Sequence, residues 1–128
     1  MKWIFLVLLL PLQAYSSTCI STEDKSFVWN QKYAEEISIK TEFFDGSYTV
    51  AIETPTELGG YAFNGVSLSV DNIDDPTFFT MLFTGEVDES HRAWYSVRAE
   101  MVRKHFITVS FGFHGCEGIA VTKQVVFN

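Results

Sequence analysis

Three histidines and two cysteines are the side chains of this sequence best suited to chemistry. Because histidine titrates near neutral pH, His91 or His114 could act as the general base of a small hydrolase. A nucleophile beside such a base is often marked by a motif, and the sequence contains no G-x-S-x-G, no H-E-x-x-H and no phosphate-binding glycine loop. We therefore predict no catalytic residues and no cofactor, and we keep a secreted hydrolase as an alternative function.

The two cysteines, Cys19 and Cys116, can form one pair within the chain. In an oxidising compartment an even number of cysteines predicts a disulfide. The bond would close a loop of about 98 residues and would contribute roughly 4–5 kcal/mol in the chain-entropy model. It would hold the N-terminal segment against the C-terminal hairpin, and a bonded Cys116 could not bind a metal as a thiolate.

Carboxylates gather in one predicted turn, where Asp71, Asp74 and Asp75 lie close together in the sequence. Carboxylate oxygens are ligands that Ca²⁺ prefers, so this turn is a weak calcium candidate, although the spacing of an EF-hand is absent. Acidic turns also occur simply because they are well solvated. A calcium-stabilised structural domain is therefore a second alternative function, and we predict no transition-metal site.

Aromatic side chains provide the candidate binding residues, in two groups. One group would lie on the outer face of a C-terminal sheet, and the other lies in the segment 55–64, which we predict to be a loop. Tryptophan, tyrosine and arginine dominate the binding energy of protein interfaces, so both groups are candidate contacts for another protein. Alternatively, the first group only covers a sheet and the second closes one end of the core. The first group is Trp94, Arg98 and His114, and the second is Tyr61 and Phe63.

The elements that must position these residues are strands, because apolar and polar residues alternate with a period of two. The clearest unit is a hairpin of 37–44 and 47–53 around Asp45-Gly46, a pair typical of a type I′ turn. A two-residue turn there pairs Phe43 with Tyr48. A slip of one residue would place every apolar side chain opposite a polar one, so the register is well specified.

The segment 92–102 is ambiguous between strand and helix. As a helix spanning 90–104 it would bring Trp94, Val97 and Met101 to one face. As a strand that turns at 103–105 it would pair with 106–114, placing Val97 opposite Phe111, and this pairing also brings Trp94 beside His114. Four apolar pairs fit better than three helical positions, so we favour the strand.

The last predicted hairpin turns near Gly115-Cys116-Glu117. A register centred on Cys116 pairs Phe111 with Val121 and places Lys123 opposite Val109, on the apolar face. Such a lysine must lie at a sheet edge or extend its ammonium group outward along its alkyl stem.

Two further runs, 66–70 and 78–84, bring the expected total to about seven strands. Seven short strands joined by turns predict an all-β fold, an antiparallel β-sandwich of immunoglobulin-like size. The alternatives are a small closed β-barrel and an α+β fold with the helix at 90–104.

The N-terminus predicts export. One lysine precedes an apolar run, 3–10, which ends at Pro11, and small residues at Ala14 and Ser16 suit a signal peptidase. We therefore expect a signal peptide at 1–16 and one domain at 17–128, located in the periplasm or secreted, with no membrane association after cleavage.

Charge narrows the choice of partners. Without the signal peptide the chain has eight Lys or Arg and sixteen Asp or Glu, a formal charge of −8. Such a balance disfavours nucleic acids and anionic membranes, which bind clustered cations. We expect a non-enzymatic module that binds another protein, as an inhibitor or an assembly subunit.

Overall fold

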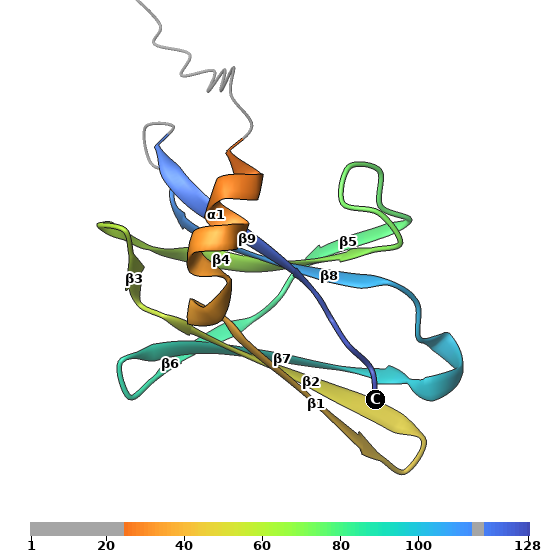
Figure 1. The fold of residues 1–128 in the computed structure, drawn as a ribbon. Coiled ribbons are helices and arrows are strands. Elements are labelled where there is room, and N and C mark those ends of the chain that lie inside the picture. The colour runs from red at the N-terminus through yellow and green to blue at the C-terminus, as the bar shows by residue number, and fades with distance from the viewer. Residues whose placement is uncertain (1–24, 114–116) are drawn as a thin grey trace, which may run out of the picture.

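Two antiparallel sheets face each other in the computed structural model, which describes residues 25–113 and 117–128 (Figure 1). The first sheet has the strand order β1-β2-β7-β6, and the second has the order β3-β4-β8-β9, with β5 also paired to β4. The sheets do not close into a barrel. The strands of this sandwich are β1 Ser38–Phe44, β2 Ser47–Pro55, β3 Glu57–Leu58, β4 Tyr61–Val70, β5 Phe78–Met81, β6 Thr84–Val87, β7 Ser90–Arg98, β8 His105–Gly112 and β9 Gly118–Gln124.

The first hairpin has the predicted turn and register. Asp45 and Gly46 have φ angles of 49° and 76°, as a type I′ turn requires, and Phe43 pairs with Tyr48. Gly59-Gly60 forms a second two-residue turn with both φ angles positive, so β3 and β4 pair where we predicted a loop at 55–64. The predicted strand at 78–84 is divided into β5 and β6, which belong to different sheets. These two differences account for nine strands in the described residues instead of about seven.

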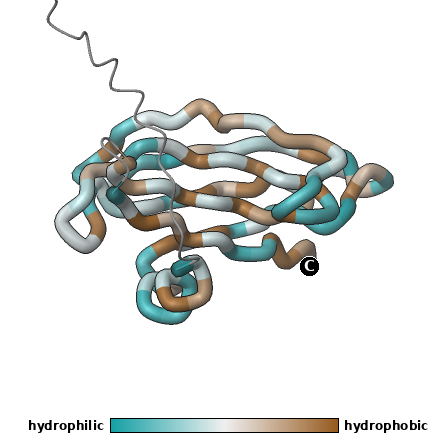
Figure 2. Tube along the Cα trace, turned by 90° about the horizontal axis from the view of Figure 1, so that it is seen from above, coloured by the Kyte–Doolittle hydropathy of each residue, from teal (hydrophilic) through white to brown (hydrophobic). Residues whose placement is uncertain are grey.

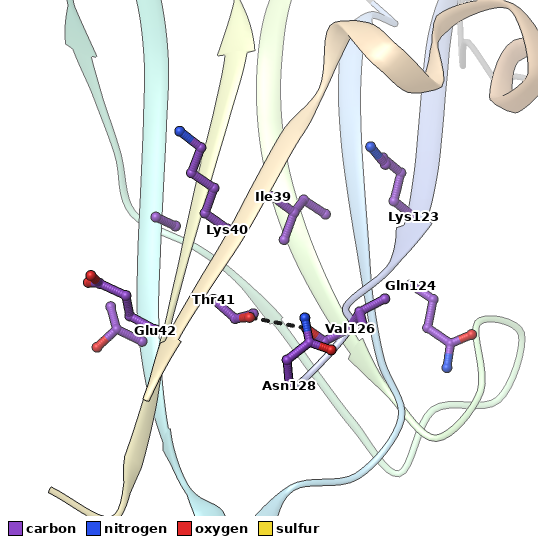
Figure 3. A pocket seen from close by; sticks show the side chains of 10 residues that line it. Ile39, Lys40, Thr41, Glu42, Lys123, Gln124, Val126 and Asn128 are labelled. Atoms are coloured by element: carbon purple, nitrogen blue, oxygen red, sulfur yellow. Dashed lines mark hydrogen bonds between the residues drawn. The ribbon is translucent and has the colours of Figure 1, made fainter. Parts of the chain in front are cut away.

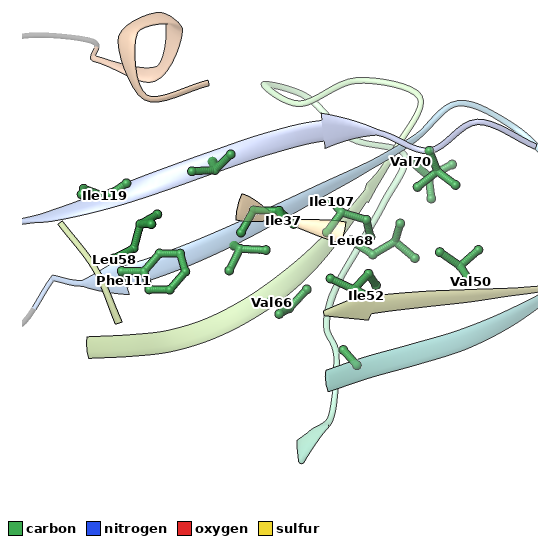
Figure 4. Packing of buried hydrophobic residues seen from close by; sticks show 14 residues of the cluster. Ile37, Val50, Ile52, Leu58, Val66, Leu68, Val70, Ile107, Phe111 and Ile119 are labelled. Atoms are coloured by element: carbon green, nitrogen blue, oxygen red, sulfur yellow. The ribbon is translucent and has the colours of Figure 1, made fainter. Parts of the chain in front are cut away.

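The core lies between the sheets, where the inward positions of the strands meet (Figure 4). Hydrophobic and hydrophilic residues alternate along several strands in the hydropathy view (Figure 2), as expected for sheets with one buried face. Each fully buried valine, isoleucine or phenylalanine contributes about 1.5–3 kcal/mol, so this cluster dominates the stability of the fold. The buried hydrophobic residues are Ile37, Val50, Ile52, Leu58, Val66, Leu68, Val70, Ala93, Ile107, Val109, Phe111, Ile119, Val121 and Val125.

A short helix, α1 (Ser26–Tyr33), and the 3₁₀ turn η1 (Ala34–Glu36) pack beside β9. The side chain of Asn30 accepts a hydrogen bond from the Thr122 amide at 2.8 Å. The ammonium group of Lys123 donates to the carbonyl oxygens of Ala34 and Ile37, at 3.0 and 2.8 Å. Lys123 therefore lies on an edge strand, as expected, and these contacts cover an edge that would otherwise be open to other strands.

The predicted pairing of 92–102 with 106–114 is wrong. Strand β7 pairs with β2 and β6 in the first sheet, whereas β8 pairs with β4 and β9 in the second. After Arg98 the chain passes through the 3₁₀ turn η2 (Ala99–Met101) and crosses to the other sheet, so this connection is an arch. Alternating strands satisfy many pairings equally well, and β2 offers β7 a matching inward row. The alternative helix at 90–104 is also absent, because 90–98 is strand.

The last hairpin has the predicted neighbours but a register shifted by two residues. Val109 pairs with Val121, and Phe111 with Ile119. The cause lies at the end of β8, where Gly112 and Phe113 have positive φ angles of 82° and 68° and Phe113 leaves the ladder. Because a shift of two residues preserves the faces of the strands, the same side chains are buried.

Several expectations lie outside the described residues: the signal peptide at 1–16, both cysteines of the expected disulfide, Cys19 and Cys116, and His114. Among the residues that the structure describes, no helix is long and apolar enough to span a bilayer.

Candidate functional site

One long side of the sandwich contains an apolar opening between the sheets. Strand β6 pairs with β7 only from Ser90 to Ala93, so the rest of β7 has no neighbour on that side within the described chain. In the other sheet, β5 is the outer strand on the same side. Between them is a cavity of about 530 Å³, which we call the lateral cavity. Its lining residues are Leu68, Val70, Thr77, Phe78, Thr80, Leu82, Tyr95, Ser96, Val97, Met101, Arg103 and His105.

A tyrosine and a histidine provide polar groups in this largely apolar lining. The Tyr95 hydroxyl and Nδ1 of His105 share a hydrogen bond of 2.7 Å. Burial raises the pKa of the Tyr95 hydroxyl above its usual range. Burial also lowers the pKa of His105, while the negative charge of Asp71 partly opposes this shift. Both side chains are therefore neutral near pH 7, so neither adds a charge to the lining of the cavity.

An ion pair holds one end of the lateral cavity. The guanidinium of Arg103 contacts the Asp71 carboxylate at 2.5 Å, and the Thr77 hydroxyl donates to the same oxygen at 2.5 Å. The Asp71 amide also donates to the Lys104 carbonyl oxygen at 2.8 Å. These bonds join the end of β4 to the segment that enters β8, and they fix the shape of that end.

The three aspartates of the calcium candidate do not converge. Asp71 is paired with Arg103, and the Asp74 amide donates a hydrogen bond to the side-chain oxygen of Asn72. Across the residues that the structure describes, no three His, Cys, Asp or Glu side chains lie close enough to hold a metal ion. Asp75 lies in the same turn and is not part of a possible metal-binding group among the described residues.

Exposed apolar side chains occur along β5 and just after it, and we call them the apolar strip. It consists of Phe78, Phe79, Met81 and Phe83. Phe83 is 97% exposed and the other three are 56–59% exposed. Phe78 lines the lateral cavity, whereas Phe79 and Met81 pair with Ser69 and Ser67 and point to the outer face of the second sheet. The sequence of 78–84 predicts an ordinary strand. Its continuous apolar character, without alternation, was the available signal that both of its faces carry apolar groups.

The strip lies within a long acidic part of the chain. From Thr41 to His91 the sequence has no lysine or arginine and ten aspartates and glutamates. Total composition conceals this asymmetry because all eight cations of the expected mature chain lie outside that stretch. The exposed apolar groups therefore belong to a segment rich in negative charge.

The predicted group of Trp94, Arg98 and His114 is not formed by the predicted pairing. Trp94 is 66% exposed on the outer face of the first sheet, opposite Ala51. Arg98 is opposite Ser47 and pairs with Glu100 at 3.7 Å on the surface. Trp94 and Arg98 share one face of β7, at the part of the strand that β6 leaves unpaired.

The second predicted group closes an end of the core. The Phe63 ring stacks on His91 with a centroid distance of 4.0 Å, and it meets Phe111 edge-on at 6.0 Å. Tyr61 also packs against the core. The buried Thr54 hydroxyl, across the strand pair from His91, has no hydrogen-bond partner among the described residues, so no Thr–His nucleophile–base contact is formed.

A second groove, of about 720 Å³, lies on the opposite side of the sandwich, between β1 and the C-terminal residues (Figure 3). The Thr41 hydroxyl donates to the Val126 carbonyl oxygen at 3.1 Å and joins its two walls. Lys40, Glu42 and Gln124 place charged and polar groups along its lining. None of the side chains of the apolar strip lines it.

Comparison with known proteins reveals no relative: no family model, no curated protein and no solved structure gives a significant match. Chemically, the lateral cavity can accept apolar side chains.

Proposed function

We propose that this protein is an exported, non-enzymatic module that binds another protein through the lateral cavity and the apolar strip. The observation that carries the proposal is the exposure of four large apolar side chains in six residues, with Phe83 97% exposed. Apolar patches of this kind on soluble domains mark interaction sites. Export is supported by the charged, apolar and small-residue pattern of residues 1–16.

The energetic reason is burial. Removing one phenylalanine side chain from water contributes about 1.5–3 kcal/mol, so a partner that covers both faces of β5 can gain most of the affinity of a specific complex from three phenylalanines and a methionine. Aromatic residues and methionine are also enriched at the centres of interfaces. The adjoining cavity adds a concave, apolar surface for an anchor residue of the partner.

Charge selects the partner. The carboxylates of the stretch from Thr41 to His91 would attract a basic surface and repel an acidic one. The partner that fits is therefore a protein whose contact segment combines apolar side chains with lysine or arginine. Because such attraction is screened by ions, its association rate should fall as salt rises.

The other candidate functions receive less support. A hydrolase based on His91 would need a nucleophile hydrogen-bonded to that histidine, and the ring is instead stacked on Phe63. A calcium-stabilised domain would need converging carboxylates, which the described part of the turn at 71–75 does not provide.

Photo-crosslinking in the native host tests the proposal. A photoreactive amino acid replaces Met81 or Phe83 in the full chain, and the same amino acid at Phe27 serves as the control. Phe27 is 70% exposed on α1, which packs against β9 at the other edge of the second sheet. One discrete crosslinked protein from positions 81 and 83, absent from position 27, is the expected result. Identical products from all three positions, or none, would overturn the proposal.

A further inference from the structure

The backbone of β7 presents unused hydrogen-bonding groups to the lateral cavity. Asp88 and Glu89 both have positive φ angles, so β6 and β7 are joined by a two-residue turn that makes Val87 and Ser90 a hydrogen-bonded pair. In antiparallel ladders such pairs alternate along the strand. The backbone groups of Arg92 therefore also face β6, and those of Ser96 and Arg98 face the same edge past Thr84, where β6 begins.

The opposite edge of β7 gives the same alternation independently. The Ala99 amide donates to the Gly46 carbonyl oxygen at 2.9 Å, which fixes the phase of the ladder between β2 and β7. With that phase, Tyr95 and Val97 hydrogen-bond to β2 through their backbones. In the described chain no backbone hydrogen bond involves the other edge at Ser96 or Arg98. Two successive residues of that edge are thus ready to pair with another strand.

The side chains around this edge define what an added strand would carry. Tyr95 and Val97 point toward the lateral cavity and line it, whereas Trp94 is exposed on the outer face. Side chains of neighbouring strands that share a row point the same way. An added strand would therefore direct alternate side chains into the cavity, beside Tyr95 and Val97, and the others toward solvent.

We infer that the partner contributes an extended segment, which continues the first sheet beyond β6 by pairing with β7 at Ser96 and Arg98. Two apolar side chains of the segment, two residues apart, enter the lateral cavity, and basic residues flank them. This inference rests on the proposed function and specifies its mode, strand addition to an open sheet edge. The occupant is apolar because the cavity walls are apolar, and its flanks are basic because the stretch from Thr41 to His91 is acidic.

The size of the cavity agrees with this occupant. A volume of about 530 Å³ is in the range of pockets that bury small ligands, and it is large enough for two apolar side chains. The end held by the Arg103–Asp71 ion pair limits how far the segment can extend.

The test uses random ten-residue peptides displayed on phage and selected against the full mature protein. The decisive variant is Ser96→Pro, which removes an amide that no described residue uses. Proline is tolerated on an edge strand where the missing N–H faces solvent. Its matched control is Ser96→Ala, which also removes the 3.4 Å contact between the Ser96 and Thr49 hydroxyls but keeps the amide. Glu86→Pro, on the outer edge of β6, controls for proline in an edge strand, and circular dichroism checks folding.

Phe78→Asp separates this inference from the proposed function, because it places a charge at the cavity without changing the β7 edge. The selected peptides should alternate apolar residues between basic ends, and Ser96→Pro and Phe78→Asp should each weaken their binding at least tenfold. Ser96→Ala and Glu86→Pro should bind within twofold of the parent. If Phe78→Asp weakens binding but Ser96→Pro does not, strand addition is wrong and the proposed function stands. If no peptide is selected, or neither variant weakens binding, both are wrong.

If Ser96→Pro does not fold, peptides methylated on alternate backbone nitrogens replace it. Methylation of the peptide nitrogens that face β7 should abolish binding. Methylation of the intervening nitrogens, which face away from β7, should preserve it. Equal effects of the two alternations would overturn the inference.

Discussion

The hydrogen bond of 2.7 Å between Tyr95 and His105 joins the two sheets of the sandwich. Tyr95 belongs to β7 in the first sheet and His105 to β8 in the second, and both line the lateral cavity. The His105 ring is also packed edge-on against Phe127 at 5.1 Å. This contact holds the sheets together on the side where no strand of the described residues closes the gap between them.

Replacing the tyrosine tests that role. Tyr95→Phe keeps the ring but leaves Nδ1 of the buried His105 without its partner, so the free energy of unfolding should fall by about 1–3 kcal/mol. Urea unfolding gives this quantity. Tyr48→Phe is the matched control, because the Tyr48 hydroxyl makes no hydrogen bond among the described residues, and it should change stability by under about 0.5 kcal/mol. Equal effects of the two substitutions would contradict the role of the Tyr95–His105 bond.

Stability should fall in mild acid because of His105. Its pKa is lowered in the folded protein by burial, so below the ordinary value of about 6.5 the unfolded state binds the proton first. The loss should begin as pH falls through about 6.5 and end below the lowered pKa of the folded state. Urea unfolding between pH 7.5 and 5.5 measures it. His105→Gln should flatten this part of the profile, and an unchanged slope would show that another group is responsible.

Lys123 should anchor the N-terminal helix. Lys123→Met keeps the alkyl stem but removes the two hydrogen bonds to the carbonyl oxygens of Ala34 and Ile37. We expect amide hydrogen exchange in 26–36 to accelerate by tenfold or more, while exchange in β8 stays unchanged. Gln124→Met, at the neighbouring exposed position, is the control. If exchange in the helix is the same in both variants, the anchor lies elsewhere.

Cys19 and Cys116 should form a disulfide in the mature protein. Labelling of the unreduced, unfolded chain with a thiol reagent should find no free thiol, and mass spectrometry should place the first residue near Ser17. Cys116→Ser should lower the free energy of unfolding by up to about 5 kcal/mol. Two labelled thiols per chain would contradict the pairing.

Local features of the fold could be predicted from the sequence, and long-range pairings could not. The hairpin around Asp45-Gly46 was predictable to the residue because its turn and its alternation specify one register. The partner of β7 was not, because an alternating strand fits β2 and β8 equally well and the arch through η2 has no marked turn. The helix α1 was missed because its start has no capping side chain and it is stabilised by contacts with β9.

The same contrast holds for the candidate site, where local features could be predicted and long-range contacts could not. Trp94 lies on an outer sheet face, as predicted, but its predicted neighbours depended on a pairing that the structure replaces. The lateral cavity could not be predicted, because it exists only where β6, which begins at Thr84 opposite Ala93, leaves the rest of β7 uncovered. The acidic stretch around the apolar strip was visible in the sequence as a long absence of lysine and arginine.

Residue-resolved amide hydrogen exchange along β7 tests the open edge most directly. In the free protein we expect Ser96 and Arg98 to exchange at least tenfold faster than Tyr95 and Val97, whose amides bond to β2. In the complex with a selected peptide, Ser96 and Arg98 should slow to match their neighbours. Uniform protection of the four amides in the free protein, or no change at Ser96 and Arg98 in the complex, would contradict binding by strand addition at this edge.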